Sequence, residues 1–249
     1  MAPAMVVFVT ITALAEGVVR FGRVPGWLVP PPSDVVRAMW EFRATLLEAT
    51  GYTLEAAAMG FALSVIAGIT IAIALSASKL VERAFYPYAV FFQTVPIVAV
   101  APLLVIWFGY GLQTVAISAF IVSVFPVIAN TLTGLVSTDP ALRDLFRLYG
   151  GGSWTTLWKL RLPSALPNIF TGMRVAAGLA VIGAIVAEFF ASPTGLGNVI
   201  MRSMTGRNTA LVFAGILLAT ALGLALFGLV NGAAHLSMRR WHTSEQERR

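Results

Sequence analysis

Long apolar runs alternate with short polar stretches along the whole 249-residue chain. A helix needs about 20 apolar residues to cross about 30 Å of hydrocarbon, so each run of this length predicts a membrane span. Six segments meet this criterion: Ala4–Val19, Thr53–Ala77, Phe85–Phe108, Leu112–Leu135, Ile169–Ala191 and Ala210–Ala233. The pattern therefore predicts an all-α, polytopic membrane protein.

The first run is the weakest of the six, because it is short and carries Glu16. Its Ala13-Leu14-Ala15 end also fits a signal-peptide cleavage site, but no basic region precedes the apolar stretch. We therefore expect a first transmembrane helix and an outer amphipathic segment over residues 1–52, and a core domain over residues 53–249.

Composition agrees with this interpretation and excludes several functions. Hydrophobic residues make up 58% of the chain and charged residues 11%, against roughly a quarter charged in soluble domains. The net charge of +6 does not indicate a nucleic-acid partner, because the basic residues are scattered between the apolar runs. Cysteine is absent, and His235 and His242 lie together near the C-terminus, so neither a thiolate zinc site nor a histidine–carboxylate metal cluster is available.

The Lys and Arg residues of the connections predict the orientation of the chain. If both termini are cytoplasmic, eleven of the seventeen basic residues fall on the cytoplasmic side and six fall outside. Arg174 is counted here at the cytoplasmic foot of the fifth span. We therefore expect both termini in the cytoplasm.

The connection over residues 138–167 is too long for a turn and carries both charge signs and aromatic residues. Asp139-Pro140 fits the start of a helix with proline at its first position. We expect a short helix on the cytoplasmic surface, closed by Gly150 in the left-handed conformation. The Gly150–Gly152 run lacks the following Lys and Ser/Thr of a phosphate-binding loop, so the energy source is bound elsewhere.

The same connection carries a spaced motif, in which Asp144-Leu-Phe-Arg-Leu-Tyr-Gly150 is followed after nine residues by Leu160-Arg161-Leu162-Pro163. In this spacing the chain resembles the permeases of binding-protein-dependent ABC importers. Their pattern is Glu-Ala-Ala, three residues, Gly, nine residues and Ile-x-Leu-Pro. Here Asp144 replaces Glu, Leu145 and Phe146 replace the alanines, and Leu160 replaces Ile, whereas the Gly, Leu and Pro are intact.

The resemblance implies a type I importer permease whose short loop helix is a coupling helix, seated in a cleft of a separate ATPase. The coupling residues are then Asp144, Gly150, Leu160, Leu162 and Pro163, and the chain returns to the membrane through Pro163 and Pro167. The implied partners are a second permease copy, expected to be identical, two ATPase subunits that hold ATP and Mg, and an extracytoplasmic substrate-binding protein. No cofactor is expected on this chain, and its expected location is the bacterial inner membrane. The alternative is an amphipathic helix that only anchors the loop.

A second resemblance begins at Gln93-Thr-Val-Pro-Ile-Val-Ala-Val-Ala-Pro-Leu103 and extends through Trp107-Phe-Gly-Tyr-Gly111 to Gly195-Leu-Gly197. These stretches are similar to the branch that imports nitrate, sulfonates and taurine, or thiamine precursors and riboflavin. Within this branch, the residues of the first two stretches are most similar to the riboflavin and pyrimidine-precursor permeases. In this family the binding protein largely determines substrate specificity.

Prolines predict an irregular third span. Pro96 and Pro102 each remove a helix hydrogen bond, so the helix should bend or unwind and free carbonyl groups. Gln93, Thr94 and Pro96 are therefore candidates to line a hydrated pathway, with Ser123 and Asn130 of the fourth span facing them. The alternative for these polar residues is hydrogen bonding between helices as packing contacts.

Two acidic residues lie in apolar runs. Glu188 falls in the last turn of the fifth span, so it is a further candidate to line the pathway, with a role in gating or in an ion pair. Because it is close to the outer boundary, a carboxylate in contact with water is the alternative. Glu16 is expected to be solvated without a special role.

Small residues at four-residue spacing, Ala176, Ala180 and Ala184 in one span and Gly228 and Gly232 in another, predict helix-packing faces, within one subunit or across a dimer. A different feature is the short outer connection that holds Arg202 and Arg207 without an acidic residue. These two cations are candidates to dock acidic patches of the binding protein. The alternative is that both reach lipid phosphates.

Two other functional classes fit less well. A secondary transporter or channel would need coupling-ion sites, a selectivity ring or inverted repeats, and no carboxylate near mid-membrane or internal repeat is found. An intramembrane enzyme would need a nucleophile with its base or a set of metal ligands within the bilayer, and the apolar runs contain none.

Overall fold

A computed structural model describes residues 2–22, 25–78, 80, 84, 87–88, 94 and 96–238, and every regular element in this part of the chain is helical. In chain order these elements are α1 (Ala2–Phe21), α2 (Pro32–Glu41), α3 (Arg43–Leu75), α5 (Ile97–Phe108), α6 (Leu112–Val136), α7 (Pro140–Leu148), α8 (Ser153–Thr156), the π-helix η1 (Leu157–Arg161), α9 (Leu162–Ala191), α10 (Leu196–Thr205) and α11 (Thr209–Met238).

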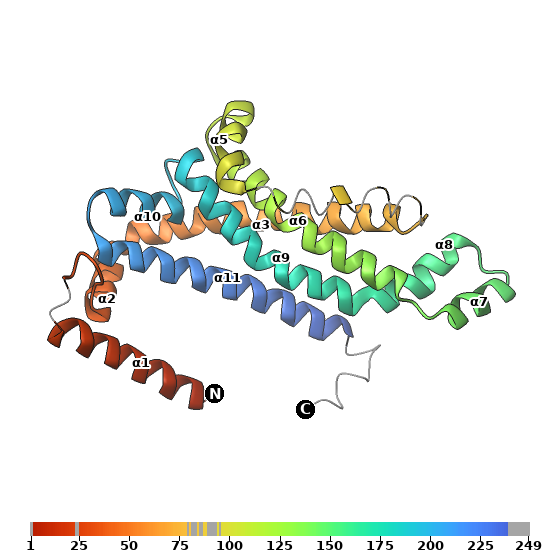
Figure 1. Cartoon of the computed structure of the whole chain (residues 1–249), viewed down its shortest axis with the longest axis horizontal. Coiled ribbons are helices and arrows are strands. Elements are labelled where there is room, and N and C mark those ends of the chain that lie inside the picture. The colour runs from red at the N-terminus through yellow and green to blue at the C-terminus, as the bar shows by residue number, and fades with distance from the viewer. Residues whose placement is uncertain are drawn as a thin grey trace.

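Four long helices, α3, α6, α9 and α11, form a bundle along the long axis of the molecule (Figure 1). α6 packs against both α3 and α9, and α11 packs against α9. α7 and α8 lie beyond one end of the bundle, called here the α7 end, whereas α2 and α10 lie at the other, called the α10 end.

α6 packs closely against both neighbours because glycines face it. A Cβ atom added at Gly60 of α3 would lie 2.5 Å from the Cβ of Ala119, and one added at Gly183 of α9 would lie 2.9 Å from the Cα of Ala119. Gly68 and Gly172 approach α6 in the same way further along. Where lipid removes the hydrophobic drive for helix association, such close approach supplies the van der Waals contact that holds helices together.

The two predicted small-residue faces differ. Ala176, Ala180 and Ala184 are fully buried, and the last two belong to the main core cluster, so the predicted packing face of α9 is confirmed within this chain. Gly228 and Gly232 of α11 are exposed, and a Cβ added at either would meet no atom within 4 Å. Packing of this second face across a dimer therefore stays a prediction.

In the part of the chain that the structure describes, four helices are long and apolar enough to cross a membrane: Arg43–Leu75, Leu112–Val136, Thr209–Met238 and the continuous helical stretch Ser153–Ala191. They correspond to four of the six predicted spans. The first predicted span forms the twenty-residue helix α1. Of the third, α5 forms the last twelve residues, and much of the stretch before Pro96 lies outside the described residues. The number of membrane crossings stays a prediction.

The helix that contains the fifth predicted span starts well before Ile169. The chain is helical from Ser153 onward through η1, with Pro163 in the first turn of α9 and Pro167 inside the helix. Pro163 lies just after η1, and a π-helical adjustment of this kind accommodates the hydrogen bond that a proline cannot make. As a consequence Arg174, counted at the foot of the span, lies near the middle of the thirty-residue α9.

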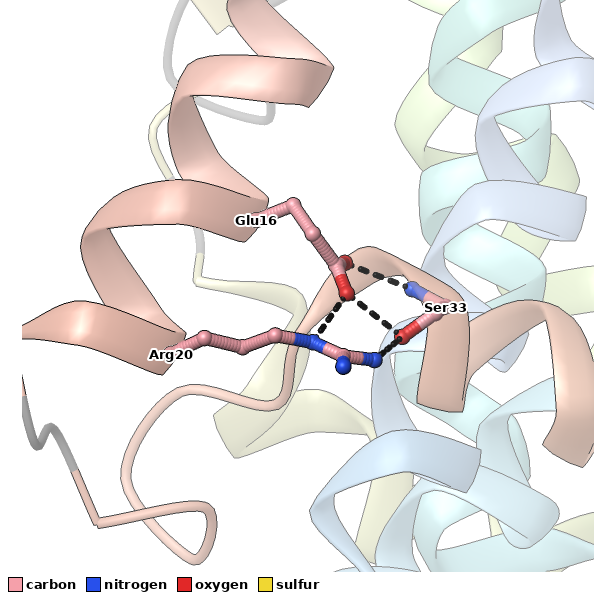
Figure 2. A network of polar contacts seen from close by, with 3 residues as sticks. All are labelled: Glu16, Arg20 and Ser33. Atoms are coloured by element: carbon pink, nitrogen blue, oxygen red, sulfur yellow. Dashed lines mark hydrogen bonds and ion pairs between the residues drawn. The ribbon is translucent and has the colours of Figure 1, made fainter.

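α1 is joined to the rest of the chain through α2. Figure 2 shows the Glu16 carboxylate accepting hydrogen bonds from the backbone N–H and the hydroxyl of Ser33, at 3.0 and 2.8 Å. Arg20 forms an ion pair with Glu16 and donates to the Ser33 hydroxyl at 2.9 Å. Because Ser33 lies in the first turn of α2, Glu16 caps the start of this helix from another element. Its side chain stays 27% exposed.

Candidate functional site

The short helix expected in the 138–167 connection is α7, and local sequence sets both its ends. Asp139 accepts a hydrogen bond from the N–H of Ala141 at 2.8 Å, and Pro140 occupies the first helical position. At the other end Gly150 has φ +76°, and the N–H of Gly151 donates to the carbonyl of Phe146 at 2.8 Å. These bonds form a Schellman cap, so the predicted left-handed conformation of Gly150 is confirmed.

α7 has no buried residue. Its Leu142 and Leu145 are 43% and 45% exposed and Leu148 is 84% exposed, although they lie beyond the apolar spans. The Asp144 carboxylate faces water and forms a long, exposed ion pair with Arg147 at 3.8 Å. An amphipathic helix with its apolar residues uncovered offers a contact surface to a partner.

Aromatic side chains extend this surface beyond the cap. Tyr149 is 86% exposed, and Trp154 and Trp158 are 70% and 61% exposed. The two indole rings stack with their centroids 6.5 Å apart. We refer to α7, Tyr149 and these two tryptophans together as the α7 surface.

The second half of the motif anchors the α7 surface to the bundle. Leu160 is buried with Leu157 in a cluster that contains Leu135 of α6 and Ala165 of α9, and Leu162 packs against the same cluster. The Leu-x-Leu part of the motif thus supplies apolar contacts, whereas Asp144 and Gly150 belong to the exposed part.

Two arginines that the sequence reasoning did not select tie this region to the ends of the membrane helices. Arg161 of η1 donates to the Leu135 carbonyl at 3.1 Å and to the Ser76 carbonyl, beyond α3, at 3.3 Å. Arg143 of α7 donates to the Val136 carbonyl at 2.7 Å. Carbonyls at a helix C-terminus lack intrahelical partners and carry partial negative charge, so guanidinium groups suit them. The available signal was the position of each arginine close to an apolar run: Arg143 follows Leu112–Leu135 and Arg161 precedes Ile169–Ala191.

The two pathway candidates of α6 form contacts within the bundle. Ser123 is fully buried and its hydroxyl lies 2.6 Å from that of Ser64 in α3, which agrees with the packing alternative, and pathway lining stays a prediction. Asn130 donates to the Pro126 carbonyl at 2.9 Å and faces Gly172 of α9.

The remaining pathway candidates lie around the start of α5. Pro96 is exposed and has extended backbone angles at the N-cap of α5, which agrees with the predicted interruption, whereas Pro102 lies inside α5. Thr94 is also exposed, and Gln93 lies outside the described residues.

Glu188 is 0% exposed, so the expectation of a carboxylate in contact with water is wrong. Its two oxygens accept from the Gly197 N–H at 2.7 Å and from the Thr53 hydroxyl at 2.8 Å, and that hydroxyl accepts from the Leu196 N–H at 2.9 Å. No described cation pairs with it. The backbone folds over the carboxyl group, because α10 starts beside it and its first N–H groups need acceptors.

Gly195 allows this approach. It has φ +104°, and a Cβ there would lie 2.3 Å from the Glu188 Cδ. Glu188, Thr53 and the start of α10 therefore form one buried polar cluster, called here the Glu188 cluster, that joins α3, α9 and α10.

Arg202 and Arg207 are both exposed at the α10 end. Arg207 has φ +55°, and the N–H of Asn208 donates to the Ser203 carbonyl at 2.9 Å, so Arg207 occupies the cap position that Gly150 occupies after α7. Arg207 also lines a cavity of about 580 Å³ together with Trp27 and Met204. Among the described residues, no group of three or more histidine or acidic side chains could hold a metal ion.

Comparison with known proteins agrees with this architecture. Residues 60–240 match the family described as binding-protein-dependent transport system inner membrane component. The chain is 35% identical over 205 residues to a formylaminopyrimidine transport permease protein of Halalkalibacterium halodurans, covering 82% of each chain. It is 31% identical over 222 residues to a riboflavin transport system permease protein of Chloroflexus aurantiacus, covering 88% of this chain and 82% of the relative.

A solved structure shares the fold. A chain of the MetNI methionine ABC transporter in inward-facing conformations aligns with a TM-score of 0.65 at 17% identity, covering 81% of this chain and 98% of the other. The chain therefore belongs to the family of binding-protein-dependent inner membrane components, the multi-pass permease subunits of type I ABC importers, in which a separate ATPase subunit supplies the energy.

Proposed function

We propose that the α7 surface is the coupling surface of this permease and sits in a cleft of the ATPase. The observation that carries the proposal is the combination of an uncovered, capped amphipathic helix with a buried anchor behind it. Closure of the ATPase dimer would move α7, and Arg143 and Arg161 would pass this motion to the ends of α6 and α3.

The transported solute is a small molecule delivered by a binding protein. The proposed substrate is either a pyrimidine precursor of thiamine or riboflavin itself, and the names of the two relatives support this proposal. Nitrate, sulfonates and taurine are the alternatives within the class. Ligand screening on the partner binding protein tests the identity of the solute, and ATP-dependent uptake in proteoliposomes then tests its import. A chain that purifies without an ATPase and takes up solute on an ion gradient alone would instead be a secondary transporter.

The α7 end is cytoplasmic in this proposal, and so are both termini. The absence of native cysteine makes the orientation testable by single-cysteine labelling. A membrane-impermeant maleimide should label Trp154→Cys only from the cytoplasmic side and Arg202→Cys only from the outside, since both positions are exposed. Labelling in the opposite sense contradicts the orientation and the role of α7.

The α10 end is then the docking side for the binding protein, with Arg202 and Arg207 facing acidic patches. A non-glycine residue in the left-handed region is held at an energetic cost, which suggests that the Arg207 side chain is needed where it stands. Replacing both arginines by Gln should slow binding-protein association and weaken its salt dependence. An unchanged rate and salt dependence would assign the two side chains to lipid phosphates.

The functional unit is proposed to contain a second, identical permease chain. The exposed Gly228 and Gly232 of α11 are one candidate contact, because small residues allow two helices to approach closely. Cysteine crosslinking from Gly228→Cys tests this face. A crosslinked dimer supports a contact between the two permeases at α11, and the absence of a crosslink in the assembled transporter contradicts such a contact.

A further inference from the structure

Arg174 is a half-buried charged residue of α9 that the coupling and docking surfaces leave without a role. It lies near the middle of α9, about 18 Å along the helix axis from Leu162 at 1.5 Å per residue. It therefore belongs to the continuous helical stretch Ser153–Ala191, which is long and apolar enough to cross a membrane. A cation in such a stretch is costly unless it faces protein partners or water.

Protein partners are missing in the described part of the chain. The Nε atom of Arg174 is buried and has no hydrogen-bond partner, and no described carboxylate forms an ion pair with the group. The polar residues Asn130 and Ser123 of α6 do have partners, because Asn130 donates to a backbone carbonyl and Ser123 pairs with Ser64.

The position of Arg174 on α9 indicates what it faces. Gly172 and Ala176 are buried toward the rest of the bundle. In contrast, Thr171 and Val175 are exposed, and a Cβ added at Gly178 would meet nothing within 4 Å. Since residues three and four apart share a helix face, Thr171, Arg174 and Gly178 lie on one stripe, in which Thr171 is exposed and the other two residues are half-buried.

We propose that this stripe lines the transport pathway and that Arg174 donates hydrogen bonds there to oxygen acceptor groups of the passing solute. The inference rests on the proposed function and adds the binding chemistry of the pathway. A guanidinium has five N–H donors in a planar fork and no acceptor, which suits carboxylate, sulfonate and paired carbonyl oxygens. Water in the pathway solvates the charge when no solute is present.

Cysteine modification tests this proposal without knowledge of the solute. Gly178→Cys and Thr171→Cys are made singly in the assembled transporter, with Arg174 or Arg174→Gln. Each cysteine is treated with a sulfonate-bearing and a trimethylammonium-bearing methanethiosulfonate of similar size. We expect both reagents to react, and the ratio of sulfonate to ammonium rates to fall about tenfold with Arg174→Gln, because a nearby unit charge in a partly screened site is worth about 1.4 kcal/mol or more.

Arg202→Cys at the exposed α10 end is the matched control, whose rate ratio should not depend on residue 174. If neither stripe position reacts, the stripe faces lipid or protein. If the ratio of sulfonate to ammonium rates does not change with Arg174→Gln, the guanidinium does not face the pathway. Either outcome overturns the inference. Because labelling is measured without ATP, a failure here is distinguishable from failure of the proposed function, which would appear as a missing ATPase partner or as uptake without ATP.

Discussion

The two ends of the bundle carry short helices that are alike in form and different in how they are held. α7 has nine residues and α10 has ten, and both end in a Schellman cap, with Gly150 and Arg207 in the left-handed position. α7 has no buried residue, whereas four residues of α10 are buried: Leu196, Gly197, Ile200 and Ser203.

The contacts that hold the two short helices also differ, because those of α10 are buried and those of α7 lie behind an exposed helix. α10 starts on the Glu188 cluster, fully inside the protein, so any change there leaves a buried polar group without a partner. α7 is held from behind by the Leu160 contacts and by guanidinium bonds to carbonyls. One end is therefore built into the core, while the other is an exposed surface on a firm base. Changes at the first should affect folding and changes at the second should affect coupling.

The largest effect is expected from Gly195→Val. The new side chain would overlap the Glu188 carboxyl group and would need a left-handed backbone that β-branched residues avoid. The folded protein should lose about 3 kcal/mol or more, so little of it should be recovered in a monodisperse form. Recovery is measured by size-exclusion chromatography in detergent. Gly223→Ala in α11, where a Cβ meets no atom, is the control and should behave as the wild type.

Gly150→Val should leave the protein folded and abolish transport. A Cβ at this position has open space around it, so only the left-handed backbone is penalised, by about 1–2 kcal/mol. The cap would open and the α7 surface would lose its shape. Uptake in proteoliposomes and ATPase binding are compared with the yield of inserted protein. Normal uptake by this variant would show that the cap is not needed for coupling.

Arg161→Gln should reduce transport about tenfold while ATP hydrolysis continues. The shorter neutral side chain cannot span from α6 to the end of α3, and a hydrogen bond from a charged donor is worth roughly 1.5–3 kcal/mol. The ratio of solute transported to ATP hydrolysed is the measurement, because a purely structural defect would lower both rates together. Lys159→Gln removes a charge from the exposed side of the same π-helix and serves as the control.

The smallest effect is expected from Glu16→Gln. This residue also caps a helix, α2, but its carboxylate is partly exposed and shares its partner Ser33 with Arg20. Water can replace the lost interaction, so thermal unfolding in detergent should shift only slightly. A loss of stability as large as that of Gly195→Val would contradict the distinction between exposed and buried caps.

Local patterns alone determined much of this protein. Runs of about 20 apolar residues predicted the long helices, and Asp139-Pro140 and Gly150 predicted both ends of α7. These features could be predicted because hydrophobic length, an N-cap and a left-handed glycine depend on residues close together in the sequence. The motif spacing predicted the family for the same reason.

The tertiary structure decided the features that join distant segments. Glu188 and Thr53 are 135 positions apart in the sequence, and Arg161 and Ser76 are 85 positions apart. No local pattern could therefore show that Glu188 bonds to Thr53 or that Arg161 bonds to the Ser76 carbonyl. Ser123 contacts α3 because Ser64 faces it, and Arg174 lies near the middle of α9 because this helix continues through its prolines. A polar group in a membrane bundle takes its role from the groups that fold around it, and only the packed structure supplies them.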